Sequence, residues 1–258
     1  MSSQDSTFRY AKHISVEKRN GYTVVRLADP WKEGRTLHRY ILVNHKDSAH
    51  LSGHIPEGTV VYVPIRRAVV FTAAHANLIE MLHAGDAIAG VADPQYMHIP
   101  DIQKRIAGSP ANAPGSAHAI CNVGNSMKPD VEKIISMRAD AIFLSPFENS
   151  GGYGRLEEIN IPIIECADYM EQGPLGRAEW MKFYGMLLGR ETEADSLFSV
   201  VEANYNSLKV KVRRAKKTLS VLPDRKTGSV WYVPGGQSSV GLMYKDAGGR
   251  YAYSSDSH

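Results

Sequence analysis

Residues 68–91, AVVFTAAHANLIEMLHAGDAIAGV, give the clearest indication of the fold of this chain. The segment opens with a short apolar run, continues with an apolar pattern of helical period over 74–84, and closes with a second apolar run. Short continuous apolar runs predict strands that are buried on both faces, and the intervening helix supplies the crossover that parallel strands need. The stretch therefore predicts a strand–helix–strand unit of a parallel sheet.

The same alternation continues as far as residue 166. Apolar runs occur at residues 68–73, 87–91, 119–123, 141–145 and 161–166, and helical patterns lie between them at 74–84, 129–138 and 155–160. Pro129 is expected at the first position of its helix, where the missing N–H costs nothing. Strands that alternate with helices predict an α/β fold, here a Rossmann-like parallel-sheet lobe with helices on both faces.

The first sixty residues differ from this pattern, because their apolar residues alternate with polar ones. Strands are predicted at residues 22–27, 39–43 and 58–65, and we interpret residues 1–60 as an antiparallel, β-rich extension of an N-terminal lobe that spans 1–175.

After residue 166 the apolar spacing becomes helical. An amphipathic helix is predicted over 176–188 and should end at Gly189, and a second helix of about 25 residues should follow it. Its basic end, which includes Lys216 and Lys217, complements the helix dipole. We interpret 176–218 as a helical spine, and 219–258 as the beginning of a C-terminal α/β lobe whose first strand is expected at 229–233.

Composition excludes several classes of protein. Of the 258 residues, 43% are hydrophobic and 22% are charged, and the mean hydropathy is −0.28, which argues against a disordered chain. No apolar run approaches the roughly 18 residues of a membrane span. The net charge of +3 comes from the last fifty residues, whereas the main body is slightly acidic, which is atypical of a nucleic-acid-binding protein.

Motifs for metal binding and catalysis are weak. Cys121 and Cys166 lack the CxxC spacing of a zinc site, and we expect buried free thiols, with a disulfide as the alternative. The glycine-rich loop that begins at Gly151 has the wrong spacing for a phosphate loop. His50 and His54 lie in the β-rich region, and with His75 and His118 they form no convincing ligand set. No metal site is predicted, although a zinc or manganese carrier that uses His75 stays open.

Hydrolytic catalysis also lacks a signal, since the chain has no GxSxG motif. An intracellular α/β enzyme remains an alternative. The stronger signal lies in the loops that follow the predicted strands, at residues 72–75, 93–96, 124–127, 145–148 and 168–171. In a parallel sheet these loops share one edge, and their aromatic, small and isolated polar residues suit recognition of a bulky ligand better than chemistry.

Three segments carry a resemblance to a known family. They are VVYVPIRRAVVFTAAHANLIEMLHAGDAIAGVADPQY, NVGNSMKPDVEKIISMRADAIFLS and IPIIECADYMEQGPLGRAEWMKFYGMLLGRETEADSLF. The chain resembles the periplasmic substrate-binding proteins of ABC importers for iron–siderophore complexes, haem and cobalamin, in which one long helix joins two lobes. Asn122 stands where the family commonly has Asp.

The resemblance implies a solute-binding protein that captures a bulky metal chelate between its lobes and delivers it to a permease, without an enzymatic reaction or a resident cofactor. A ferric siderophore is the first expectation, with haem and cobalamin as alternatives. The expected ligand-binding residues are His75, Tyr96, Asn125, Phe147, Glu148, Arg155 and Tyr169 in the first lobe, and Trp231, Tyr232 and Gln237 in the second. Glu80 is the candidate for an exposed acidic residue that docks to the permease.

The family is periplasmic or otherwise extracytoplasmic, and it is often tethered by a lipid on an N-terminal cysteine. This chain starts with Met1 and a polar stretch that resembles neither an export signal nor a lipid anchor. The second lobe is expected to be cut short near His258. The long helix between the lobes predicts only a small hinge motion on binding.

Overall fold

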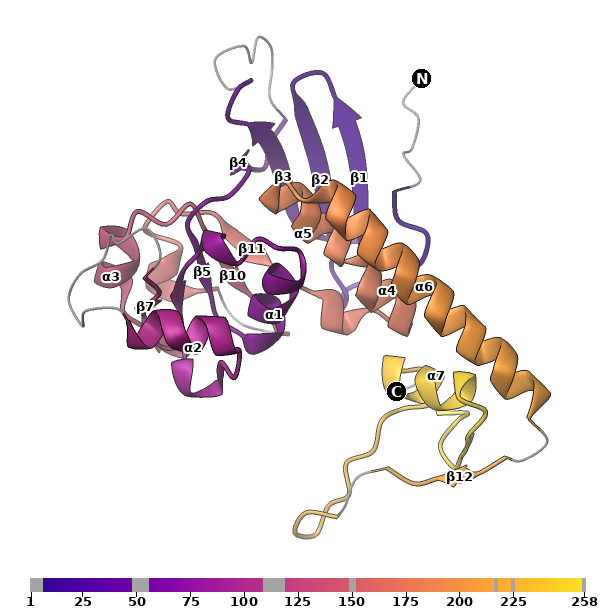
Figure 1. Cartoon of the computed structure of the whole chain (residues 1–258). Helices are drawn as coiled ribbons and strands as arrows, with labels where there is room; N and C mark the ends of the chain where they lie inside the picture. The colour runs from indigo at the N-terminus through magenta and orange to yellow at the C-terminus, as the bar shows by residue number, and fades with distance from the viewer. Residues whose placement is uncertain are drawn as a thin grey trace.

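The computed structural model of the chain describes residues 7–47, 56–108, 119–148, 152–215, 218–223 and 226–256. Five parallel strands form the central sheet, in the order β11-β10-β5-β6-β7 (Figure 1). Their bounds are β5 (Ala68–Val70), β6 (Ile88–Val91), β7 (Cys121–Asn122), β10 (Ala141–Leu144) and β11 (Ile163–Glu165). Each strand falls inside one of the five apolar runs, so the predicted α/β fold is confirmed.

The helices of this lobe are α1 (Ala73–Met81), α2 (Pro100–Ala107) and α3 (Val131–Ser136). Helices α1 and α3 match the predictions, whereas α2 was not predicted, because its eight residues carry only a short apolar pattern. Pro129 is not the first residue of α3. It lies in β9 (Lys128–Pro129), paired with β8 (Gly124–Asn125), and the Asp130 side chain caps the helix by accepting the N–H of Lys133 at 3.1 Å.

The two faces of the parallel sheet carry separate layers of the core. Ile142 packs in a cluster with Ile134 of α3, whereas its neighbour Phe143 packs in a second cluster with Ile79 of α1. Successive side chains of a strand point to opposite faces, so the helices cover both sides of the sheet. This part of the prediction is confirmed.

The prediction of a helix at 155–160 is wrong. The described residues there form only a short 3-10 turn, η4 (Gly154–Leu156). Gly152 and Gly154 have φ values of +99° and +55°, and Asn160 has a φ of +54°. Gly154, at the start of the turn, and Asn160, after it, are both left-handed, so too few residues lie between them for a longer right-handed helix.

The N-terminal extension forms a second sheet of β1 (Ile14–Arg19), β2 (Tyr22–Ala28), β3 (Thr36–Asn44) and β4 (Thr59–Val63), in that order. Strands β2 and β3 are antiparallel as predicted, and β1, which was not predicted, pairs antiparallel with β2, but β4 pairs with β3 in parallel. The all-antiparallel prediction is therefore wrong. Residues 45–58 separate β3 from β4, which is long enough for the crossover that a parallel pair requires.

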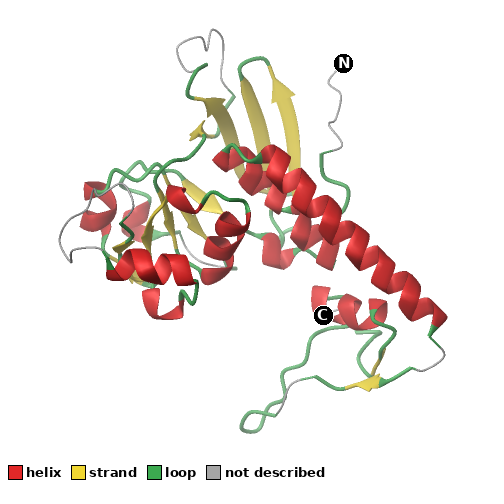
Figure 2. Cartoon of the chain, viewed as in Figure 1, coloured by secondary structure: helices red, strands yellow, loops and turns green. Residues whose placement is uncertain are grey.

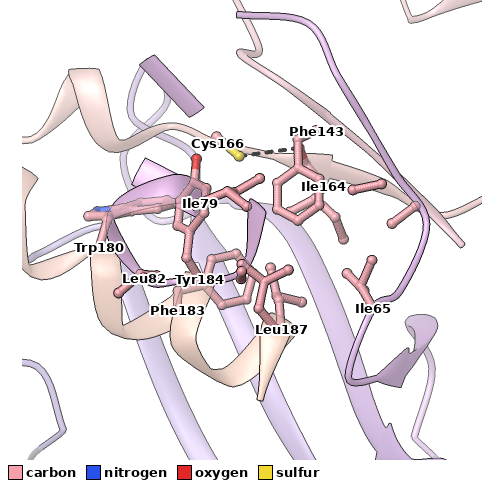
Figure 3. Packing of buried hydrophobic residues seen from close by; sticks show 14 of the residues in the cluster. Ile65, Ile79, Leu82, Phe143, Ile164, Cys166, Trp180, Phe183, Tyr184 and Leu187 are labelled. Carbon is pink, nitrogen blue, oxygen red and sulfur yellow. Dashed lines mark hydrogen bonds between the residues drawn. The ribbon is translucent and has the colours of Figure 1, made fainter. Parts of the chain in front are cut away.

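A single large core joins the two sheets. Trp180, Phe183, Tyr184 and Leu187 are fully buried at its centre, and Figure 3 shows them with Phe143 of the parallel sheet. Their spacing repeats every three or four residues, as expected for the buried face of a helix. Together these side chains fill the space between the sheets.

Hydrogen bonds also tie β11 to the N-terminal sheet. The Tyr40 hydroxyl donates to the carbonyl oxygen of Ile163 at 2.9 Å and accepts the N–H of Glu165 at 2.9 Å. The Glu165 carboxylate lies 2.7 Å from Nδ1 of His38 on β3. The position of the parallel sheet against the extension is thus held by polar contacts as well as by packing.

Two buried glutamates hold the segment before β1, and we call this arrangement the N-terminal clasp: residues 9–13 with Glu171 and Glu179. The Glu179 carboxylate, which is fully buried, accepts the backbone N–H groups of residues 9–11 at 2.7–3.0 Å. The Glu171 carboxylate accepts those of residues 12 and 13 and the indole N–H of Trp180 at 2.8–2.9 Å. Each buried carboxylate therefore accepts three N–H groups, and that of Glu179 also lies 3.4 Å from Nζ of Lys182.

The spine consists of α4 (Pro174–Glu179), α5 (Met181–Leu188) and α6 (Glu191–Arg214). The helix predicted at 176–188 is interrupted at Trp180, and Gly189, with a φ of +65°, ends α5 as predicted. Helix α6 has 24 residues, which confirms the long second helix. Lys216 and Lys217 lie outside the described residues.

The C-terminal residues form a small parallel unit of β12 (Ser220–Val221), α7 (Ser239–Asp246) and β13 (Arg250–Tyr251), which lies beside the far end of α6 (Figure 2). The Asp246 carboxylate accepts the Tyr205 hydroxyl at 2.8 Å and lies 2.9 Å from Nζ of Lys209, so α7 is tied to α6.

The strand predicted at 229–233 does not form. Thr227 and Val230 instead make an isolated bridge around Gly228, whose φ is +62°. The residues that follow have no pairing partner among the described strands. The division of the chain into 1–175, 176–218 and 219–258 stays a prediction.

Candidate ligand-binding site at the carboxyl edge of the sheet

All five strands of the central sheet run in one direction, so the loops that follow them meet at a single edge. We call this the carboxyl edge: residues 71–75, 92–96, 123–127, 145–148 and 166–170. It contains the candidate residues His75, Tyr96, Asn125, Phe147, Glu148 and Tyr169. The topology thus places these predicted residues on one side of the lobe.

His75 lies at the base of this edge, on the first turn of α1. The Thr72 side chain begins the helix by accepting the N–H of His75 at 3.3 Å, and the imidazole is held inside, with only 4% of the residue exposed. Its Nε2 lies 3.3 Å from the Ser145 hydroxyl and 3.9 Å from Oδ1 of Asp168. Nε of Arg177 on α4 lies 3.4 Å from the other oxygen of Asp168.

Burial controls the protonation of this group. It lowers the pKa of His75 to about 4, with a smaller contribution from the positive charge of Arg177. Burial also raises the pKa of Asp168, an effect that Arg177 opposes. Nδ1 of His75 and Oδ1 of Asp168 are buried without a hydrogen-bond partner among the described residues. The base of the edge therefore offers a neutral imidazole and free hydrogen-bonding capacity.

Ser145, His75 and Asp168 are the residue types of a hydrolytic triad, and the sequence did not predict that they would meet. In such a triad the serine and the carboxylate contact opposite nitrogens of the imidazole. Here both face Nε2, at 3.3 Å and 3.9 Å. This geometry does not orient the imidazole to activate the serine.

Four large apolar side chains stand exposed at the carboxyl edge, and we call them the rim. Tyr96 is 67% exposed, Met127 83%, Phe147 55% and Tyr169 37%. They come from four different loops of the carboxyl edge. The Tyr169 hydroxyl donates to the carbonyl oxygen of Pro146 at 2.5 Å, which links two of these loops. Such a rim can cover an extended flat ligand.

Met127 and Arg177 were not predicted as site residues. Met127 lies in a loop that the sequence had already singled out, and the presence of a methionine in that loop was the available signal. Arg177 lies beyond the predicted loops, in α4, so only the fold brings its half-exposed guanidinium to Asp168.

The remaining first-lobe candidates lie differently. The Asn125 side chain is used internally, since its Nδ2 donates to Asp93 at 3.1 Å and its Oδ1 accepts the N–H of Met127 at 2.8 Å. Glu148 is exposed. Arg155 pairs with Glu132 at 3.2 Å on the outer side of α3, and no contact joins it to His75 among the described residues.

Trp231, Tyr232 and Gln237 lie in the C-terminal unit, with their side chains exposed. The structure does not bring them into contact with the rim. The link between the two regions is α4, which neighbours both η5 (Asp168–Met170) and α7. The C-terminal unit is therefore positioned next to the helix that carries Arg177.

Glu80 is not the freely exposed acid that was expected. It is half-buried against the backbone of Gly85, where a Cβ atom would lie 2.4 Å from its carboxylate oxygens. Burial, with the nearby charge of Asp101, raises its pKa. Packing of α1 on the following turn thus conceals most of this side chain.

Cys121 and Cys166 are free, but only Cys166 is buried and Cys121 is half-buried. Within the described residues no group of three or more His, Cys, Asp or Glu side chains could hold a metal ion. Across those same residues, no helix combines the length and apolarity required to cross a bilayer. His50, His54, His118 and Gly151 lie outside the described part of the chain.

Comparison with known proteins places most of the chain in one family. A family described as periplasmic binding protein matches residues 69–258. An uncharacterized lipoprotein of Methanocaldococcus jannaschii is 30% identical over 190 residues, which cover 70% of this chain and 43% of that protein. This chain thus spans less than half the length of that relative.

Solved structures share the fold at low sequence identity. A possible iron-binding (periplasmic solute-binding) protein from Staphylococcus epidermidis aligns with a TM-score of 0.55 and 15% identity, over 74% of this chain and 69% of that chain. The periplasmic heme binding protein HutB of Vibrio cholerae gives 0.52 and 15%, over 73% and 66%. The siderophore binding protein BauB, bound to acinetobactin and ferric iron, gives 0.51 and 18%, over 72% and 62%.

Proposed function

Because the chain belongs to the periplasmic binding protein family, we propose that it is an extracytoplasmic solute-binding protein that captures a bulky metal chelate and delivers it to the permease of an ABC importer. The ligand class we favour is a ferric siderophore, with haem or cobalamin as alternatives. The protein would carry out no reaction of its own.

The rim is the observation that supports this proposal. Large apolar side chains are normally buried, and exposed ones that gather at one site mark a binding surface. Here four of them come from loops at the carboxyl edge of a parallel sheet, the usual position of ligands in open α/β folds, and the same edge holds the buried imidazole of His75. The distances around Nε2 of His75 disfavour hydrolysis, so binding is the better account of the site.

Each group has a proposed role in holding the chelate. Tyr96, Phe147 and Tyr169 would contact its flat faces, while His75 and Arg177 would meet polar or anionic groups at the base. Arg155 and Glu148 would lie at the margin. Trp231, Tyr232 and Gln237 would contact the ligand from the C-terminal side, in the way that a second lobe covers a cleft.

The similar structures support an iron chelate as ligand, since one is described as iron-binding, one as heme binding and one holds ferric acinetobactin. At such low sequence identity, the similarity of these structures supports the fold directly and supports the ligand class only by analogy. The lipoprotein relative supports an extracytoplasmic location and tethering by a lipid. Glu80, although half-buried, is the proposed contact for the permease.

Titration of the purified chain against ferric siderophores, ferric citrate, haem and cobalamin tests the proposal, with tryptophan fluorescence and ligand absorbance as readouts. We expect saturable binding of one chelate at micromolar affinity or tighter, and weaker binding by Phe147→Ala. The matched control is Tyr62→Ala, which removes an exposed aromatic from the N-terminal sheet and should leave affinity unchanged. Absence of binding to every chelate would contradict the proposal.

A further inference from the structure

Asp93 is positioned between two loops of the rim. It follows β6 and starts the 3-10 turn η3 (Pro94–Tyr96), which carries Tyr96. Its backbone has a φ of +48°, an uncommon conformation for a residue other than glycine. Such a conformation persists only where surrounding contacts hold it, so the contacts of Asp93 identify what the turn is built around.

The carboxylate of Asp93 collects donors from the neighbouring loop. Oδ2 accepts the N–H of Ser126 at 3.0 Å, and Oδ1 accepts Nδ2 of Asn125 at 3.1 Å. Its own turn adds Nε2 of Gln95 at 3.3 Å. Hydrogen bonds from Ser126, followed by those from Gln95 and Asn125, lower the pKa of Asp93, which keeps the acceptor charged.

Backbone hydrogen bonds of Asp93 also connect it to the loop 124–127 and to its own turn. Asp93 N–H donates to the carbonyl oxygen of Gly124 at 2.8 Å, and its carbonyl oxygen accepts the N–H of Tyr96 at 2.9 Å. On the far side, Oδ1 of Asn125 accepts the N–H of Met127 at 2.8 Å. A continuous set of hydrogen bonds therefore runs from Tyr96 through Asp93 to Met127.

We propose that Asp93 is a positioning residue that fixes Tyr96 and Met127 relative to each other and thereby selects the size of the ligand that this end of the rim accepts. The selectivity part of this proposal rests on the proposed function. Asn125 acts with Asp93 in this set of hydrogen bonds, because both ends of its amide take part in it.

The first test needs no ligand. Amide hydrogen exchange of residues 93–97 and 124–128 is measured in the wild-type chain and in Asp93→Ala, Asp93→Asn and Asp101→Ala. Asp93→Ala should speed exchange at Tyr96, Ser126 and Met127 about tenfold, the factor that corresponds to about 1.4 kcal/mol. Asp93→Asn should give a smaller increase, because asparagine tolerates the left-handed backbone and keeps one acceptor. Unchanged exchange in Asp93→Ala would overturn the proposal.

Asp101→Ala is the matched control, since Asp101 is an acid of the adjacent helix whose carboxylate meets Arg105 of the same helix at 3.5 Å. It should leave exchange in both loops unchanged.

The second test compares the affinities of the same variants for haem and ferric citrate, a large and a small chelate. Asp93→Ala should change the ratio of the two dissociation constants at least about threefold, with Asp101→Ala unchanged, whereas an unchanged ratio would overturn the role in selectivity. If the wild-type chain binds neither haem nor ferric citrate, selection between these two chelates is refuted. The proposed function itself fails only if the chain binds none of the chelates named above. The exchange experiment still decides whether Asp93 organises the two loops.

Discussion

The N-terminal clasp and the carboxyl edge both bury carboxylates, and Glu171 of the clasp lies only three residues from Asp168 of the edge. In the clasp, Glu171 and Glu179 each accept three N–H groups. At the edge, Oδ1 of Asp168 and Nδ1 of His75 are buried without a hydrogen-bond partner among the described residues. In the described part of the chain, the buried carboxylates of the clasp are thus fully hydrogen-bonded, whereas buried polar atoms at the neighbouring edge are not.

We infer from this difference that the carboxylates of the clasp are structural and that the polar groups of the edge belong to the proposed binding site. Native proteins satisfy nearly all buried polar atoms, because an unmet donor or acceptor costs about 1–3 kcal/mol. The clasp follows that rule and fixes the start of the chain to α4. The edge departs from this rule, because it leaves buried polar atoms of His75 and Asp168 without a partner among the residues that the structure describes. Such unmet atoms are expected where a ligand supplies the missing hydrogen bonds. Mutations should therefore affect stability in the clasp and binding at the edge.

The largest effect is expected in the clasp. Glu179→Ala removes the acceptor of three backbone N–H groups in a fully buried place, and should lower the free energy of unfolding by about 3–5 kcal/mol. Urea denaturation measures this. Glu193→Ala, at a partly exposed glutamate of α6 paired with Arg190 at 3.8 Å, is the control and should change stability by less than about 0.5 kcal/mol. A loss below about 1 kcal/mol for Glu179→Ala would remove the distinction between the regions.

A smaller loss of stability is expected when the pH is lowered and His75, at the carboxyl edge, becomes protonated. Folding lowers the pKa of His75 from its ordinary 6.5 to about 4, so in that interval the unfolded chain binds more protons. This contribution to stability is complete above about pH 6.5 and should fall by about 3 kcal/mol as the pH drops to about 4. Asp168, whose pKa is raised, acts with the opposite sign, so the His75 contribution must be isolated by substitution.

Urea denaturation across this pH range, with His75→Gln beside the wild type, measures that contribution. The variant should show a flatter dependence, whereas Ser145→Ala, which keeps the imidazole, should retain most of the wild-type slope. Parallel curves for wild type and His75→Gln would show that the imidazole is not held neutral by burial.

The smallest effect is expected at the rim, and it should appear only in binding. Tyr96→Ala and Phe147→Ala should each weaken chelate binding about tenfold, the equivalent of about 1.4 kcal/mol, while the unfolding free energy stays within about 0.5 kcal/mol of wild type. Calorimetric titration and urea denaturation together measure the two quantities. A rim substitution that destabilises the chain and spares affinity would assign these side chains to packing.

The fold could be predicted where local pattern and long-range structure agree. The apolar runs located all five parallel strands, and Gly189 located the end of α5. The parallel pairing of β4 was not predictable from alternation, because strand direction depends on the path of the connection. The missing strand at 229–233 shows the same limit, since an extended segment becomes a strand only when a partner is present.

The candidate site was predictable in its loops and not in its base. Tyr96, Phe147 and Tyr169 follow from parallel topology alone, since their loops must share an edge. The meeting of His75, Asp168 and Arg177 depends on the packing of α4, which no local signal specifies. The hydrogen bonds of Asn125 and the partial burial of Glu80 were likewise not predictable, because contacts with neighbouring loops decide which polar side chains remain available.

Hydrogen exchange of the free and chelate-loaded chain tests the central claim, that the carboxyl edge binds the ligand and the clasp is structural. New protection is expected in the loops 72–75, 93–96, 145–148 and 168–170, whereas residues 9–13 should exchange equally slowly in both states. Protection confined to the N-terminal sheet or the clasp, with these loops unchanged, would contradict it.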